Sequence, residues 1–163
     1  MTAAPADSAG AMVYVAVAPA DAFRIFTEDI DAWWRRGPKY RVLGGARAVL
    51  HLEPRVGGRI FEAVTADAGA PVTVTGTVRV WEPPSRLVFE WRARNFAPDE
   101  LTTVEVLFEA QGPGTRVTVT HRGFAALRPD HPVRHGQSPA AFLRTMGLFW
   151  GDLLTALRLH AGA

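Results

Sequence analysis

The chain has 163 residues and a formal net charge of only +2, because its eighteen basic residues are nearly balanced by sixteen carboxylates. That length suits one domain, and the balanced charge gives no sign of a nucleic-acid-binding protein. The sequence has no cysteine, which excludes disulfides, thiol catalysis and thiolate metal ligands.

The N-terminal stretch MTAAPADSAGA has no basic segment followed by an apolar one, so it does not read as a secretory signal. We expect residues 1–11 to form a disordered tail and residues 12–163 to form a single domain. No apolar run approaches the roughly 18 residues that a membrane span needs. We therefore expect a cytoplasmic protein without a membrane partner. Its alanine- and arginine-rich composition, with Lys39 as the single lysine, suggests a GC-rich bacterial source.

The first elements along the chain are a short strand and two short helices. Residues 12–17 (MVYVAV) are rich in β-forming side chains, and Pro19 suits the first turn of the helix that follows. Residues 35–45 then form a basic, glycine-bearing loop. The apolar positions that mark the two helices are Ala22, Phe23, Phe26, Ile30, Trp33 and Trp34.

From Ala46 to Arg122 the apolar period changes to two, and turns rich in Pro and Gly recur at regular intervals. This pattern predicts about six hairpin-linked antiparallel strands, apolar on one side. A sheet of this size twists and curls. The clearest strand is 72–81, where Gly76 interrupts the apolar row and indicates a bulge or a bend. The side chains expected to share one face of that strand are Val72, Val74, Val78 and Val80.

The last stretch predicts a long amphipathic helix from Ser138 to His160. Ser138 is a good N-cap and Pro139 suits the first helical position. Gly147 and Gly151, four residues apart, indicate either close approach of another backbone or room left for a ligand. Apolar residues recur at helical spacing: Phe142, Met146, Phe149, Leu153 and Leu157. We expect this helix to cover the concave face of the sheet.

This order of elements resembles the START-like or SRPBCC superfamily, whose members have the helix-grip (Bet v1-like) fold. More narrowly, the chain resembles the AHSA1-like branch, homologous to the C-terminal domain of the Hsp90 ATPase activator. The segments that carry the resemblance are 19–34, 53–62, 76–91, 114–124 and the C-terminal FWGDLLTALRLH. The resemblance implies an α+β fold in which a curved antiparallel sheet wraps around a long C-terminal helix. It also implies a cavity between the two that binds a small, largely apolar ligand.

Aromatic side chains lie on faces that should converge between the sheet and the last helix. They either fill a solid core or line a cavity for a small hydrophobic or aromatic molecule, and the resemblance favours the cavity. His121 continues an apolar row and should face inward, as a ligand contact, an acid–base group or a hydrogen-bonded core residue. The candidate ligand-binding residues are Trp33, Trp34, Phe61, Phe89, Trp91, Phe108, His121, Phe142, Met146, Phe149 and Trp150.

Charged strand residues allow a catalytic alternative. His51, Glu53, Glu62 and Glu90 alternate with apolar neighbours. Two carboxylates and a histidine facing one cavity would suit proton abstraction. The same alternation describes a solvent-facing side of a sheet, which is the interpretation we favour.

Basic residues allow anion binding. Arg59 and Arg92 could hold an anionic group, although seventeen arginines make chance placement easy. A basic cluster near the expected mouth of the pocket either attracts an anionic ligand or is simply solvated. Its members are Arg35, Arg36, Lys39, Arg41 and Arg47.

Signals for metals and cofactors are weak. His131 and His135 are separated by Pro132 in a loop, and His51 and Glu53 have no third ligand within reach. The chain carries no P-loop, dinucleotide fingerprint or nucleophile elbow. We therefore expect neither a metal nor a cofactor.

We expect a monomer or homodimer that binds a small hydrophobic or aromatic molecule. One alternative is an enzyme resembling a polyketide cyclase or dehydratase, with His121 and a carboxylate at the reacting atoms. Another is a chaperone-interaction module like the Hsp90 activator.

Overall fold

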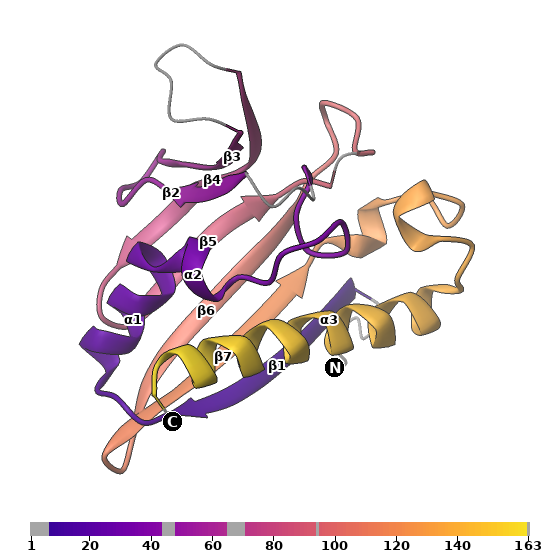
Figure 1. Ribbon diagram of the computed structural model, residues 1–163. Coiled ribbons are helices and arrows are strands. Elements are labelled where there is room, and N and C mark those ends of the chain that lie inside the picture. The colour runs from indigo at the N-terminus through magenta and orange to yellow at the C-terminus, as the bar shows by residue number, and fades with distance from the viewer. Residues whose placement is uncertain (1–6, 44–47, 65–70, 94, 163) are drawn as a thin grey trace.

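The computed structural model describes residues 7–43, 48–64, 71–93 and 95–162, and a seven-stranded antiparallel sheet dominates it. The strands lie in the order β1-β7-β6-β5-β4-β3-β2, so that β1 and β2 form the two edges. Figure 1 shows the long helix α3 running along the curled sheet, with α1 and α2 near one end. The elements are β1 (Ser8–Val15), α1 (Pro19–Glu28), α2 (Ile30–Trp33), β2 (Val49–Leu52), β3 (Arg59–Ala63), β4 (Val72–Glu82), β5 (Arg86–Trp91), β6 (Thr102–Gln111), β7 (Gly114–Arg122), the 3-10 turns η2 (Phe124–Ala126) and η3 (Pro132–Arg134), and α3 (Pro139–His160). The predicted α+β helix-grip architecture is confirmed.

The first strand begins earlier than its sequence indicates. β1 pairs with β7 along its whole length, from Ser8 opposite Arg122 to Val15 opposite Thr115. The expected tail is therefore wrong for residues 8–11, while residues 1–6 lie outside the described residues. Small side chains such as Ser8 and Gly10 carry no β-propensity of their own, and the ladder to β7 holds them extended.

The long helix begins as the sequence predicts. The Ser138 Oγ accepts a hydrogen bond from the backbone N–H of Ala141 at 3.2 Å, which caps the first turn. The two helical glycines differ in role. A Cβ on Gly147 would lie 3.7 Å from the carbonyl oxygen of Gly10 in β1, whereas one on Gly151 would meet nothing within 4 Å. Only Gly147 therefore faces a nearby backbone.

Strand β4 contains the bulge that Gly76 indicates. Ile60 of β3 pairs with Gly76, but the next residue, Phe61, pairs with Val74, so Thr75 is the extra residue. A Cβ on Gly76 would lie 1.7 Å from the carbonyl oxygen of Glu90 in β5, so this position admits only glycine without rearrangement.

The bulge also changes which side chains share a face of β4. Val72 and Val74 are 38% and 44% exposed, while Val78 is completely buried. A second irregularity between Val78 and Val80 lets Trp81 pack against the core. The prediction that Val72, Val74, Val78 and Val80 share one apolar face is therefore wrong, because extra residues reverse the alternation.

One end of the concave face is a solid core. The Phe23 ring packs against the rings of Trp81 and Phe108, with centroid separations of 5.0 Å in both cases. Phe26 packs in turn against Trp33 at 4.9 Å. Helices α1 and α2 thus supply aromatic side chains that fill this end of the sheet.

We predict opposite effects from alanine at two glycines. Gly76→Ala should lower the free energy of unfolding by about 2–3 kcal/mol, because its Cβ would overlap the β5 backbone. Gly151→Ala should raise it by about 1 kcal/mol, because alanine is the better helix former and has room there. Urea unfolding of both variants measures this, and unchanged stability of Gly76→Ala would contradict the close β4–β5 approach.

Candidate binding cavity

At the other end of the concave face, a cavity of about 460 Å³ lies between α3 and the sheet. Its walls are the N-terminal half of α3, the inward side chains of β2 to β5, and the loop that follows α2. The segments that follow β5 and precede α3 complete its rim. The sequence left two alternatives, a solid core and a cavity. Each of them describes one end of the same concave face.

Six of the eleven predicted residues line this cavity, and they come from the α2 loop, from β5 and from α3. The other five lie elsewhere. Trp33 and Phe108 belong to the filled end, while His121 and Trp150 are buried in the core. Phe61 lies on the outer side of the sheet. The six that line the cavity are Trp34, Phe89, Trp91, Phe142, Met146 and Phe149.

The side chains of β3 face the opposite sides of the sheet from those predicted. Ile60 and Glu62 line the cavity, and the intervening Phe61 points the other way because side chains alternate along a strand. On the outer face the Phe61 ring stacks on His51 at 4.8 Å, and the Arg59 guanidinium lies 4.6 Å from its centre. Ile60 and Phe61 are adjacent apolar residues, so periodicity alone allowed either phase.

Glu62 is consequently a buried carboxylate in the cavity wall, only 2% exposed, and its predicted solvent-facing position is wrong. Its Oε2 accepts the backbone N–H of Val42 at 2.7 Å, and its Oε1 accepts that of Leu43 at 3.0 Å. In the described part of the chain, no Lys, Arg or His forms an ion pair with it within 4.0 Å. Glu62 therefore fastens the loop after α2 while placing a carboxyl group in the cavity wall.

The other charged strand residues do not line the cavity. Glu53 accepts bonds from the backbone N–H, Nε and Nη2 of Arg59 at 2.7, 3.1 and 3.0 Å, and these bonds lower its pKa to about 2. Glu90 pairs with Arg79. Arg92 donates to the carbonyl oxygens of residues 98 and 100. Among the residues that the structure describes, no two carboxylates and a histidine therefore meet at the cavity.

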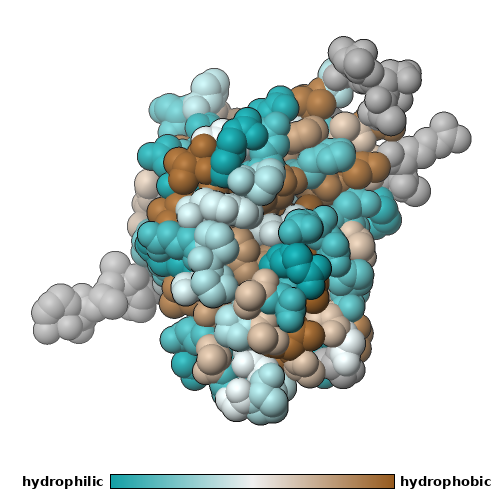
Figure 2. All heavy atoms as spheres, turned by 90° about the vertical axis from the view of Figure 1, so that its left-hand side faces the viewer, coloured by the Kyte–Doolittle hydropathy of each residue, from teal (hydrophilic) through white to brown (hydrophobic). Residues whose placement is uncertain are grey.

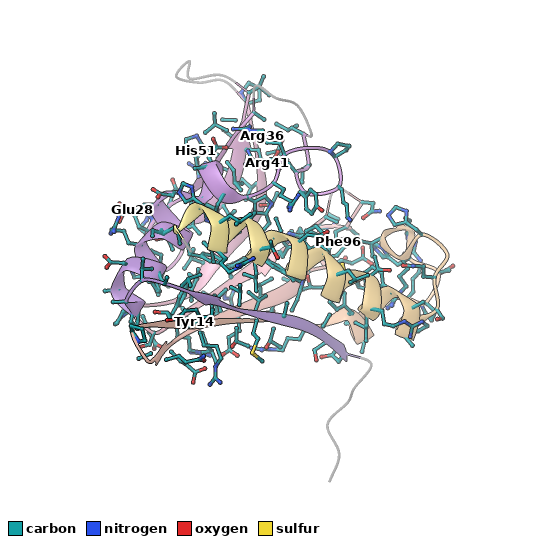
Figure 3. The ribbon with its side chains drawn as sticks, turned by 60° about the horizontal axis from the view of Figure 1, so that its bottom comes forward. Tyr14, Glu28, Arg36, Arg41, His51 and Phe96 are labelled. Carbon is teal, nitrogen blue, oxygen red and sulfur yellow. The ribbon has the colours of Figure 1, made fainter. Side chains whose placement is uncertain are left out.

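Members of the basic cluster pair with carboxylates beside the cavity, and two of them, Lys39 and Arg41, line it. Figure 3 shows Arg36 and Arg41 close together beside α2, where both bind Asp31 at 3.0 and 2.6 Å. Burial acts to raise the pKa of Asp31, but bonds from the Leu50 N–H and from Arg41 lower it overall. The side chain of Arg41 is fully buried and also donates to the carbonyl oxygen of Trp34 at 2.6 Å.

The same loop is tied to α3 through Asp152. The Tyr40 hydroxyl donates to Asp152 at 3.1 Å, the Lys39 ammonium lies 3.7 Å from the same carboxylate, and Arg35 donates to the Asp152 carbonyl oxygen at 3.2 Å. Arg47 lies outside the described residues. Tyr40 and Arg41 line the cavity but were not among the predicted ligand contacts, because loop residues have no periodic signal.

His121 is held in a buried chain of hydrogen bonds. The Trp150 indole N–H donates to its Nδ1 at 3.0 Å, so Nε2 carries the proton and donates to the Thr102 Oγ1 at 2.7 Å. The Thr102 hydroxyl donates onward to the carbonyl oxygen of Trp91 at 3.0 Å. Burial lowers the pKa of His121 to about 3. The residue does not line the cavity, so the geometry does not place it as the acid–base group of the enzyme alternative.

The two histidines of the loop before α3 have different surroundings. His131 is buried, with Nε2 2.9 Å from Glu100 and Nδ1 accepting the N–H of Val133 at 3.1 Å, whereas His135 lies at the cavity. No three His, Asp or Glu side chains gather to hold a metal among the described residues. Within the same residues, none of the helices is long and apolar enough to cross a membrane.

A curled antiparallel sheet closed by a long C-terminal helix over a cavity defines a helix-grip protein of the START-like class. The sequence profile described as "Activator of Hsp90 ATPase homolog 1-like protein" matches residues 16–144, so the chain belongs to that family. Among proteins of curated function, none matches this sequence.

Solved structures share the fold at low sequence identity. An Hsp90 activator from Plasmodium falciparum is 16% identical, with 96% of each chain covered and a TM-score of 0.63. The Aha1 dimer from Colwellia psychrerythraea is 15% identical, with 93% of this chain and 92% of that chain covered and a TM-score of 0.60. A protein from Nitrosomonas europaea is 15% identical, with 99% and 97% covered and a TM-score of 0.62.

The low pKa of His121 predicts a loss of stability in acid. Below its ordinary value of 6.5 the unfolded chain binds a proton that the folded protein excludes down to about pH 3. The free energy of unfolding should therefore fall with decreasing pH, by up to about 1.4 kcal/mol per pH unit from this group.

The test compares urea unfolding of the parent and of His121→Gln at pH 6 and pH 5, where the carboxyls with lowered pKa contribute little. The pH slope should be smaller in the variant. In the parent, imidazole nitrogen chemical shifts should show His121 neutral at both pH values. A ring that protonates near pH 6.5 would contradict the hydrogen-bonded arrangement.

Proposed function

We propose that the protein binds a small hydrophobic or aromatic molecule in the cavity between α3 and the sheet. The observation that carries the proposal is the cavity itself, with a volume of about 460 Å³ and six aromatic rings in its lining. Small-molecule sites are typically concave, mostly apolar and supplied with a few polar groups. The polar groups here include Glu62 and Thr75.

The wall of the cavity is fixed before any ligand arrives, which also supports binding. Asp31 holds the loop to α2 through Arg41, and Asp152 holds it to α3 through Tyr40. The Tyr40 ring stacks on Phe149 at 5.4 Å. A site whose wall is already ordered loses little conformational entropy on binding.

Binding is tested with uncharged aromatic and polyketide-like compounds, followed by tryptophan fluorescence and melting temperature. Trp34 and Trp91 line the cavity, so an occupant should change their emission. A ligand at a hundredfold excess over its Kd should stabilise the protein by about 2.7 kcal/mol. A flat response across a broad panel would contradict the proposal.

A cavity-filling variant locates the site. Met146→Trp should weaken binding by about tenfold or more, because the larger side chain occupies the cavity. Its stability should change little, because there is space beside the side chain. Leu148→Trp is the matched control, since Leu148 lies on the same helix and is 72% exposed. Equal affinities of the two variants would place the ligand elsewhere.

A second candidate is an Hsp90-activator-like module, which the family membership and the activator from Plasmodium falciparum favour. It would need an outer docking surface. Val49, Val72 and Val74 are each 38–44% exposed on the outer face of β2 and β4. Figure 2, viewed from the side of α1 and β2, shows hydrophobic surface interrupted by hydrophilic side chains. Stimulation of an Hsp90 ATPase by the protein would support this role, and an unchanged rate would argue against it.

A further inference from the structure

We propose that the ligand carries a protonated amine on its apolar or aromatic body, and that this amine pairs with Glu62. The inference rests on the proposed binding function and adds the chemical class of the ligand. It depends on three features of the cavity: the burial of Glu62, the pairing of the basic lining residues with other carboxylates, and the aromatic rings around it.

Glu62 has accepting capacity that the residues described by the structure do not use. A carboxylate offers about four lone-pair positions, and the described contacts are the two backbone N–H groups of Val42 and Leu43, one on each oxygen. A charge with 2% exposure on an apolar wall is costly unless an opposite charge or further hydrogen bonds compensate it. The remaining positions are available to a donor inside the cavity.

The basic residues in the lining do not provide that compensation. Arg41 directs its guanidinium to Asp31 and to backbone carbonyl oxygens, at distances of 2.6–3.2 Å. Lys39 is 60% exposed and lies 3.7 Å from Asp152. Glu62 is the single carboxylate among the described lining residues. Among the described residues Glu62 therefore has no ion-pair partner, and a cationic group beside it is favoured over an anionic one.

The rest of the lining suits an ammonium group. Aromatic faces attract cations through their quadrupole, and Trp34, Phe89, Trp91 and Phe149 all line the cavity. Thr75 also lines it, and its hydroxyl donates to the carbonyl oxygen of Ile60 at 3.2 Å, which leaves the lone pairs of the hydroxyl oxygen as acceptors. An ammonium has three N–H donors and no acceptor, which matches an arrangement of acceptors and rings.

Anchoring the loop uses one hydrogen bond on each oxygen of the Glu62 carboxylate, from the backbone N–H groups of Val42 and Leu43. These bonds involve neutral donors, so they bring no positive charge to the carboxylate. A bound cation would supply the opposite charge that the loop does not provide. Its hydrogen bond to the carboxylate would be charge-assisted and therefore stronger than a neutral one.

The experiment uses three probes with one apolar body: phenylbutylamine, phenylbutanol and phenylbutanoate. Their affinities for the intact protein are measured by isothermal titration calorimetry near neutral pH. The amine should bind about tenfold or more tightly than the alcohol, and the carboxylate should bind weakest. This comparison needs no variant, so it stands even if a substitution at Glu62 disturbs folding.

A variant pair assigns the preference to one residue. Glu62→Gln should remove most of the preference for phenylbutylamine over phenylbutanol. Glu105→Gln is the matched control, because it removes the same charge from a residue that pairs with Arg86 at 2.8 Å and does not line the cavity. Glu105→Gln should keep the parent's preference.

The outcomes separate this inference from the proposed function. Equal binding of all three probes would overturn the amine inference and leave the binding function standing. Binding of none of them, together with a flat response to the uncharged panel, would overturn both. A preference for the amine that survives in Glu62→Gln, or disappears equally in Glu105→Gln, would overturn the assignment to Glu62.

Discussion

The buried hydrogen bond between Trp150 and His121 is the contact on which the arrangement of helix and sheet depends. It joins the middle of α3 to β7, and the series of hydrogen bonds continues through Thr102 to the backbone of β5. A buried polar network of this kind must be fully paired to be tolerated, so it fixes one position of the helix. From that point α3 packs closely toward its C-terminus, where Leu153, Leu154 and Leu157 are buried. Toward its N-terminus the helix faces the cavity instead.

Two aspartates complete the enclosure from outside the sheet. Asp31 accepts from Arg41, from Arg36 and from the Leu50 N–H, so that α2, β2 and the loop between them are held at one point. Asp152 joins the same loop to α3. The basic residues that suggested an anion-binding surface are thus used to hold the protein's own carboxylates. Glu62, which also lines the cavity, forms no ion pair with any of those basic residues that the structure describes.

The sequence predicted the elements well and the cavity only in part, for physical reasons. Ser138, Pro139 and the spacing of Phe142, Met146 and Phe149 are local signals, so α3 and its inward face followed from them. The face of β3 did not, because Ile60 and Phe61 are both apolar and a bulge at Thr75 lies on the partner strand. The volume of the cavity depends on how far α3 stands from the sheet, which is a property of tertiary packing. A buried carboxylate looks the same as an exposed one in a sequence pattern.

The division of the concave face into a filled end and an open end has a consequence for how such a chain can diverge. At the filled end, rings such as Phe23, Phe26 and Phe108 touch one another, so a larger side chain there overpacks the core. At the open end, Thr75 and Met146 border empty space, and their side chains can grow or change shape without strain. Substitutions at these positions change the shape of the cavity while the fold is kept. The shape of the cavity can therefore evolve in this domain almost independently of stability.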